Sequence, residues 1–154
     1  MQLSAHFSLA EFTASDTAAR RGIDNSLPTL LMPAAQATAD MMERIRAYLS
    51  AKAGRDVPIN ITSGYRSLAV NAAVGSDSTS DHPKALAVDF KAPEFGTAAQ
   101  VAYCLSQAVD TLGIGQVIAE YSAWTHVSTR TPGKGTNRLL TINSTGATSG
   151  IVLA

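Results

Sequence analysis

The chain lacks both a disulfide framework and an excess of charge. Cys104 is the single cysteine among 154 residues, and it falls in a helical apolar pattern, so we expect a small buried side chain. Lysine plus arginine and aspartate plus glutamate both total 12, which gives a formal net charge of zero. Proteins that bind nucleic acid or anionic membranes usually carry excess positive charge. We therefore expect no nucleic-acid partner and look for a local chemical site.

Long hydrophobic runs are also absent. No apolar stretch approaches the ~18 residues that a membrane-spanning helix requires, so we expect no membrane insertion. The first residues, MQLSAHFSLAEF, have neither the basic nor the apolar region of a signal peptide. We expect synthesis in the cytoplasm, with another export route for any role outside it. The length suits one domain over residues 1–154, and we expect a monomer.

Apolar periodicity predicts helices early in the chain and strands late. A capping box formed by Ser8 and Glu11 predicts the start of a short helix. Further helices are expected at about 33–51, 68–74 and 97–112, and strands at 59–62, 85–90 and 138–143, with two more within 115–130 around a turn at 121–123. This order predicts an α+β domain with a small antiparallel β-sheet and helices packed around it.

The segment TSDHPKALAVDFK, residues 79–91, places His82 seven residues before Asp89. Strand alternation puts Asp89 on the same face as Ala85 and Ala87, while the larger apolar residues take the other face. Since the larger residues belong in the core, the Asp89 side chain is expected to face an open space bordered by two alanines.

The predicted hairpin brings further reactive side chains together. A turn at 121–123 sets Glu120 opposite Trp124, and alternation puts His126 on the face of Trp124. Two imidazoles and a carboxylate, with a second carboxylate as general base, are the parts of a catalytic zinc site. Each part also has a structural interpretation: a histidine in a strand, an edge-strand aspartate that prevents aggregation, and a charge beside a turn. Spacing alone leaves both interpretations open.

Three motifs in order resemble a known family. SGYRS, SDHPKALAVDF and EYSAWTHVS are similar to the successive motifs of the zinc D-Ala-D-Ala metallopeptidases, which are related to lysostaphin and hedgehog domains. The segments FSLAEFTASDTAARRGIDN and NRLLTIN are similar to small phage-encoded members. The resemblance covers most of the chain and implies a hedgehog/D-Ala-D-Ala-peptidase-like fold.

The resemblance implies a zinc ion held by His82, Asp89 and His126. The family pattern Ser-x-His-x-x-Gly-x-Ala-x-Asp falls on residues 80–89, with Ala85 in the glycine position. By strand parity the Ala85 methyl group is expected to narrow the floor of the cleft. Many relatives carry the catalytic acid three residues before the second histidine, where this chain has Ala123.

The remaining roles also follow from the resemblance. Phage-type members have a glutamate six residues before the second histidine, so Glu120 is the expected base, with Asp81 as the fallback. Arg66, presented outward with Tyr65 by the turn at Gly64, is expected to pair with a substrate carboxylate or the developing oxyanion. Ser80 and Trp124 are expected to support the ligands and wall the cleft.

The implied substrate is the peptidoglycan stem peptide, cut at L-Ala-D-Glu or at D-Ala-D-Ala. The implied biological role is a phage endolysin or a virion-associated lysin that reaches the periplasmic wall through a holin or a tail. Two other hypotheses remain at this point. One is a catalytically weak or inactive wall-binding protein that keeps the fold, suggested by Ala85 and Ala123, and the other is a structural phage protein without metal.

Overall fold

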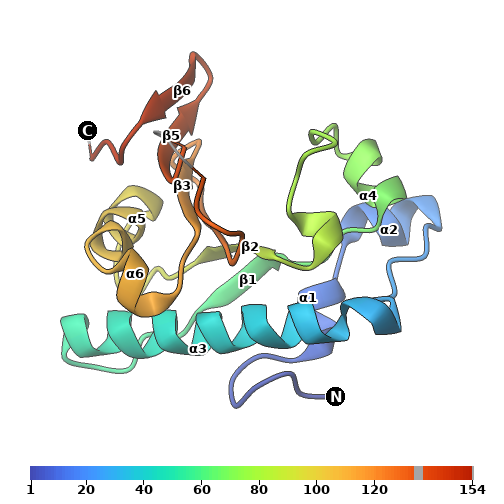
Figure 1. The fold of residues 1–154 in the computed structure, drawn as a ribbon, viewed down its shortest axis with the longest axis horizontal. Helices are drawn as coiled ribbons and strands as arrows, with labels where there is room; N and C mark the ends of the chain where they lie inside the picture. The colour runs from blue at the N-terminus through green and yellow to red at the C-terminus, as the bar shows by residue number, and fades with distance from the viewer. Residues whose placement is uncertain (134–136, 154) are drawn as a thin grey trace.

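The computed structural model describes residues 1–133 and 137–153, in which six strands form one sheet with helices against one face (Figure 1). The strands are β1 (Asn60–Ser63), β2 (Ala87–Lys91), β3 (Gln116–Glu120), β4 (Trp124–Ser128), β5 (Leu139–Asn143) and β6 (Gly146–Ser149). Their order across the sheet is β1-β2-β4-β3-β5-β6. Neighbouring strands are antiparallel except β3 and β5, which are parallel.

The helices are α1 (Leu9–Thr13), α2 (Asp16–Arg21), α3 (Met32–Ala53), α4 (Leu68–Ala73), α5 (Ala98–Ser106) and α6 (Val109–Leu112), with short 3-10 turns η1 (Thr29–Leu31) and η2 (His82–Lys84). The expected capping box of Ser8 and Glu11 opens α1. Helix α3 has a proline in its first turn and ends at Gly54, which adopts the left-handed conformation that favours glycine. None of the helices described in the structure is long and apolar enough to cross a membrane.

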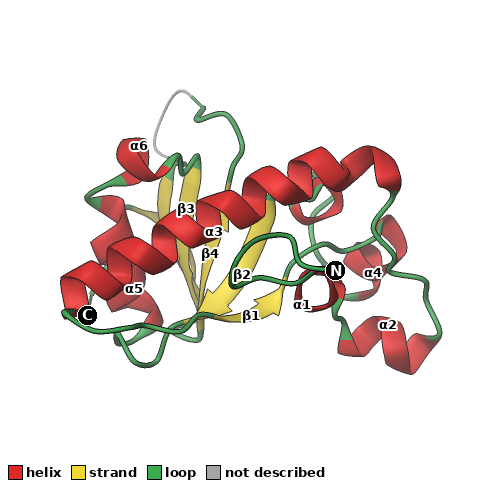
Figure 2. Cartoon of the chain, turned by 90° about the horizontal axis from the view of Figure 1, so that it is seen from below, coloured by secondary structure: helices red, strands yellow, loops and turns green. Residues whose placement is uncertain are grey.

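The two faces of the sheet differ in chemistry. One face packs on α3 and α5, and α3 crosses in front of the strands in Figure 2. The buried strand residues on this face are Val88, Phe90, Val117, Ala119 and Val127. The alternate positions of β2, β3 and β4 carry polar groups such as Asp89, Glu120 and His126 on the opposite face. The helical layer thus fixes the sheet and leaves the polar face free for a site.

The α+β class is confirmed, and so is the hairpin in which Glu120 pairs with Trp124. The helix expected at 97–112 is interrupted: the chain turns at Gln107 and Ala108, which lets Leu112 enter the core from the separate helix α6. Cys104 is therefore only partly buried at the edge of the core. Helix α2, strand β6 and the parallel pairing of β5 were not predicted.

The strand expected at 85–90 begins two residues later, at Ala87. Pro83 lies in the first turn of η2, and this turn closes when the Ala85 N–H donates to the His82 carbonyl. Ala85 then takes a left-handed backbone with φ of 60°. The expectation that its methyl group narrows the floor of the cleft is wrong, because Ala85 is fully buried in the core beneath the Thr38 hydroxyl, which donates to its carbonyl.

Candidate metal centre

Three segments bring the expected ligands together. His82 comes from η2, Asp89 from β2 and His126 from β4, and Asp89 and His126 are direct partners in the antiparallel pair. All three side chains are buried. One possible ligand atom from each residue lies within 4.8 Å of the others. The polar face of the sheet therefore carries two imidazoles and a carboxylate at one point.

The hydrogen bonds of His82 fix which ring nitrogen is available. Nδ1 lies 2.6 Å from the Gly64 carbonyl oxygen, which can only accept, so Nδ1 carries the proton. Nε2 is buried, has no hydrogen-bond partner and lies 3.3 Å from Asp89 Oδ2. A metal-bound histidine usually donates its other N–H to a carbonyl or carboxylate in this way. The bare Nε2 lone pair of His82 is thus directed at the carboxylate of Asp89.

The other distances also fit a small tetrahedral cation. His126 Nδ1 lies 2.8 Å from Asp89 Oδ1. The two imidazole rings meet edge to face, with centroids 5.2 Å apart. Ligand atoms about 2.0–2.1 Å from a tetrahedral zinc ion lie about 3.3 Å from one another, close to the separations seen here. The residues fit zinc with three protein ligands and an open fourth position.

Asp89 is held ionised. Burial alone would raise the pKa of its carboxyl group, but the hydrogen bond with His126 and the closeness of both imidazoles hold that pKa far below its usual range. Its backbone is also fixed, since the Thr62 hydroxyl donates to the Asp89 carbonyl beside a β-bulge in β1. Bulges often re-aim side chains next to active sites. A carboxylate that stays charged and oriented is suited to binding a cation.

Glu120 stands beside this group. Its Oε1 lies 3.8 Å from His126 Nδ1. Burial and the charge of Asp89 raise the pKa of the Glu120 carboxyl, whereas the positive charges of His126 and Arg66 oppose the rise. The Trp124 indole N–H has no hydrogen-bond partner of its own among the described residues. A carboxylate with a raised pKa, one side chain away from the ligands, is placed to exchange protons with a water there.

Arg66 places a cation near Asp89 and Glu120. It lines the same cleft, and its Nε is buried without a hydrogen-bond partner in the described part of the chain. Burial lowers the pKa of the guanidinium, while Asp89 and Glu120 counter this shift. A guanidinium remains charged even so. The buried Nε–H is therefore a fixed donor without an internal acceptor, as expected of a group that meets an anionic substrate.

These side chains line one cleft of about 620 Å³ on the polar face of the sheet. Ser80 lines it and accepts a hydrogen bond from the His82 N–H, and Trp124 walls it beside Tyr121. Both residues line the cleft that holds the three possible ligands, and their roles stay predictions.

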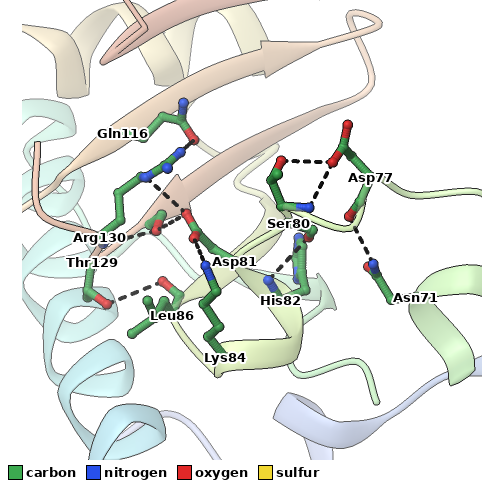
Figure 3. A network of polar contacts seen from close by, with 12 residues as sticks. Asn71, Asp77, Ser80, Asp81, His82, Lys84, Leu86, Gln116, Thr129 and Arg130 are labelled. Atoms are coloured by element: carbon green, nitrogen blue, oxygen red, sulfur yellow. Dashed lines mark hydrogen bonds and ion pairs between the residues drawn. The ribbon is translucent and has the colours of Figure 1, made fainter. Parts of the chain in front are cut away.

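Two expected site residues lie differently. Tyr65 does not point outward: it is 5% exposed and packs in the core, because its N–H donates to the Phe12 carbonyl and draws the segment inward. Asp81, the expected fallback for the base, lines the cleft, but its carboxylate accepts from the Ser128 hydroxyl and faces Arg130 and Lys84. These partners engage it in a separate network (Figure 3).

Ala123 and Glu120 lie differently with respect to the cleft. Ala123 lies in the turn before β4 and lines a neighbouring pocket rather than the metal cleft. Glu120, paired across the hairpin with Trp124, reaches the cleft instead. The hairpin register therefore supplies the carboxylate from β3.

Sequence reasoning missed Gln116, Ser128 and Arg130, which line or border the far end of the cleft. Strand alternation could have identified two of them, because Gln116 and Ser128 are register partners on the strand face that carries Glu120 and His126. Arg130 lies beyond the end of β4, where alternation gives no guide.

Comparison with known proteins identifies the family. A model of the Peptidase M15 family matches residues 5–128, which include the three possible ligands, Arg66 and Glu120. A comparison with curated proteins gave no significant match. The matched region also contains η2, β2 and β4, which carry the three possible ligands. The chain belongs to the Peptidase M15 family, the zinc D-Ala-D-Ala metallopeptidases.

Proposed function

We propose that the chain is a zinc-dependent murein peptidase that hydrolyses the stem peptides of peptidoglycan. One observation carries the proposal: the bare Nε2 of His82, the Asp89 carboxylate and His126 Nδ1 converge in one cleft with Glu120 beside them. In a metallopeptidase family, this arrangement provides three ligands and a proton carrier.

The roles of the side chains follow from their positions. A zinc ion bound by His82, Asp89 and His126 would polarise the peptide carbonyl and lower the pKa of a water to about 7. Glu120 takes a proton from the attacking water and delivers it to the leaving amine as the C–N bond breaks. Arg66 pairs with the negative charge that develops on the carbonyl oxygen. General acid–base catalysis of this kind contributes about 10²- to 10⁴-fold.

The shape of the cleft favours cleavage within a chain. Trp124 and Ile142 line it on one side of the ligands, and Gln116 and Arg130 on the other. Side chains that could contact a peptide thus lie on both sides of the cleaved bond. This supports an L-Ala-D-Glu endopeptidase over a D-Ala-D-Ala carboxypeptidase. The proposed role is a phage endolysin or virion-associated lysin, delivered through a holin or a tail, and it rests on the resemblance of residues 7–25 and 137–143 to phage-type members.

The test combines zinc content with product release from purified sacculi. Wild type should bind about one zinc per chain and release peptides, His82→Ala should lose both, and Glu120→Gln should keep zinc while losing about 10²-fold or more in rate. His6→Ala and Glu94→Gln are matched controls. His6 lies in the N-terminal segment, where it pairs with Glu43 of α3, and Glu94 is exposed.

Each outcome separates the hypotheses. Zinc-loaded wild type that releases nothing would contradict the peptidase and favour a wall-binding protein. Wild type purified without chelator that holds no zinc would contradict both. Mass spectrometry of released peptides identifies the cleaved bond, and products that have lost only a terminal D-Ala would replace the endopeptidase with a carboxypeptidase.

A further inference from the structure

A second arginine stands at the end of the cleft opposite Trp124. Arg130 follows β4, lines the cleft that holds the ligands and keeps 38% of its side chain exposed. Neither the ligand set nor the proposed proton transfers use it. Figure 3 shows its guanidinium between Gln116 and Asp81.

Two buried acceptors orient this guanidinium. Asp81 Oδ2 lies 3.4 Å from Nε, and Gln116 Oε1 lies 3.5 Å from Nη1. Gln116 is itself fixed because its Nε2 donates to the Asn137 carbonyl, which leaves Oε1 as the acceptor. The Arg130 N–H donates to the Ser128 hydroxyl, which in turn donates to Asp81. Because contacts hold both its backbone N–H and its guanidinium, Arg130 keeps one orientation before any ligand binds.

The charge around Arg130 is not balanced. Asp81 is the carboxylate it faces, and Asp81 also faces Lys84 Nζ at 3.9 Å. One negative charge is thus shared by two cations, and within residues 1–133 and 137–153 no other acidic group pairs with Arg130. The Nη2 edge of the fork has no protein acceptor in the same residues. A planar guanidinium with a free edge in a cleft suits a carboxylate.

The strand geometry sets the distance from the metal centre. Gln116 and Ser128 pair across β3 and β4, two residues from His126 along β4 on the same strand face, which corresponds to about 7 Å, and the Arg130 guanidinium is held beside Gln116. A bound extended peptide advances by the same rise per residue. An arginine at this place therefore meets the side chain or terminus of a residue two to three positions from the cleaved bond.

We propose that Arg130 is a specificity-determining residue, which pairs with a peptide carboxylate two to three residues from the cleaved bond. This inference rests on the proposed function and names the substrate as an anionic peptide. In a stem peptide, the carboxylates at this spacing from an L-Ala-D-Glu bond are those of the diamino acid side chain and the C-terminus. Arg66 would act at the reacting carbonyl and Arg130 at this distal group.

The experiment measures binding without turnover. Zinc-loaded Glu120→Gln protein is titrated with a stem tetrapeptide containing diaminopimelate and with three analogues, each with one carboxylate converted to its amide. Trp124 is the single tryptophan and lines the cleft, so its fluorescence reports binding. The titrations are repeated with double variants that combine Glu120→Gln with Arg130→Gln, Arg130→Lys or Lys84→Gln. Lys84→Gln is the matched control, because it removes the other cation that faces Asp81.

With Arg130 present, amidation of one distal carboxylate should weaken binding by about 10- to 100-fold, the usual effect of a charge-assisted hydrogen-bond pair. Arg130→Gln should bind that amide and the free acid within about threefold of each other, and Arg130→Lys should restore part of the preference. Lys84→Gln should retain the full preference.

An equal preference with and without Arg130 would overturn the proposal, and so would binding of none of the peptides. A preference lost in Arg130→Gln but not partly restored in Arg130→Lys, together with a lowered unfolding midpoint in both, would assign Arg130 a structural role instead. Because these titrations need no hydrolysis, they succeed or fail independently of the sacculus assay that tests the peptidase.

Discussion

At the scale of single residues, Ala85 adopts a backbone conformation that favours glycine. Its φ of 60° lies in the left-handed region, which costs a non-glycine residue about 1–2 kcal/mol. The methyl group points into the core and not into the cleft. The alanine at this position therefore affects backbone strain and not the lining of the cleft.

Ala85→Gly should leave the free energy of unfolding within about 1 kcal/mol of wild type. Relief of strain offsets the loss of one buried methyl group, about 0.8 kcal/mol, and the added freedom of the unfolded chain, about 0.4–1 kcal/mol. Ala102→Gly in α5 is the matched control: it is equally buried, gains no such relief and should cost about 1.5–2 kcal/mol. Equal losses in urea unfolding would contradict the left-handed conformation at Ala85.

Gly64 controls His82 from outside the ligand set. Its carbonyl oxygen accepts from His82 Nδ1, and an added Cβ would collide with the backbone and ring of Phe12. Gly64→Ala should therefore displace the carbonyl and weaken zinc binding by about 10- to 100-fold, the usual effect of removing such a partner. Competition with a zinc-binding dye measures this. Gly133→Ala, where the new Cβ meets only ordinary contacts, should leave the affinity unchanged; unchanged affinity in both variants would contradict the orienting role.

At the scale of elements, α3 anchors the N-terminal segment as well as the sheet. Glu43 accepts hydrogen bonds from the Ser4 hydroxyl at 2.6 Å and the His6 N–H at 2.7 Å, and its second oxygen lies 2.7 Å from His6 Nδ1. These contacts hold Leu3 and Phe7 in the core. Burial alone would raise the pKa of Glu43, but its hydrogen bonds with Ser4 and His6 lower it.

Glu43→Gln should reduce the free energy of unfolding by about 1 kcal/mol at pH 7. Because the pKa of Glu43 is lower in the folded than in the unfolded state, its stabilising effect is complete above the unfolded value of about 4.3. The effect is lost as the pH falls through the folded pKa, so the difference between wild type and variant should shrink as the pH is lowered below about 4.3. Urea unfolding at several pH values measures the difference, with Glu94→Gln as an exposed control. A difference that persists unchanged at pH 3 would contradict this anchor.

The sequence predicted elements best where a local pattern sets the geometry. The turn at 121–123 determines the register of β3 and β4, so the pairing of Glu120 with Trp124 followed from the sequence. The start of β2 did not, because Pro83 closes a 3-10 turn and alternation begins only at Ala87. Tyr65 was misplaced because a tertiary hydrogen bond to Phe12 decides its burial. Local sequence rules cannot include a hydrogen bond between segments as distant as Phe12 and Tyr65.

At the scale of the whole molecule, the functional arrangement depends on which strands become neighbours. Strand β4 lies between β2 and β3, so Asp89, His126 and Ile118 follow one another across the sheet. Periodicity predicted the strand faces but not this order, and the parallel entry of β5 beside β3 involves a distant segment. The motif resemblance supplied the convergence of the ligands that spacing alone left open.

The central claim is that His82, Asp89 and His126 hold one zinc ion on the polar face of the sheet. X-ray absorption at the zinc edge of purified protein tests it most directly. The account predicts nitrogen and oxygen ligands at about 2.0–2.1 Å with scattering from two imidazoles, and from one imidazole in His126→Ala if that variant retains zinc. A sulfur ligand at about 2.3 Å, which would have to come from Cys104 or a methionine, or a zinc signal without imidazole scattering, would contradict it.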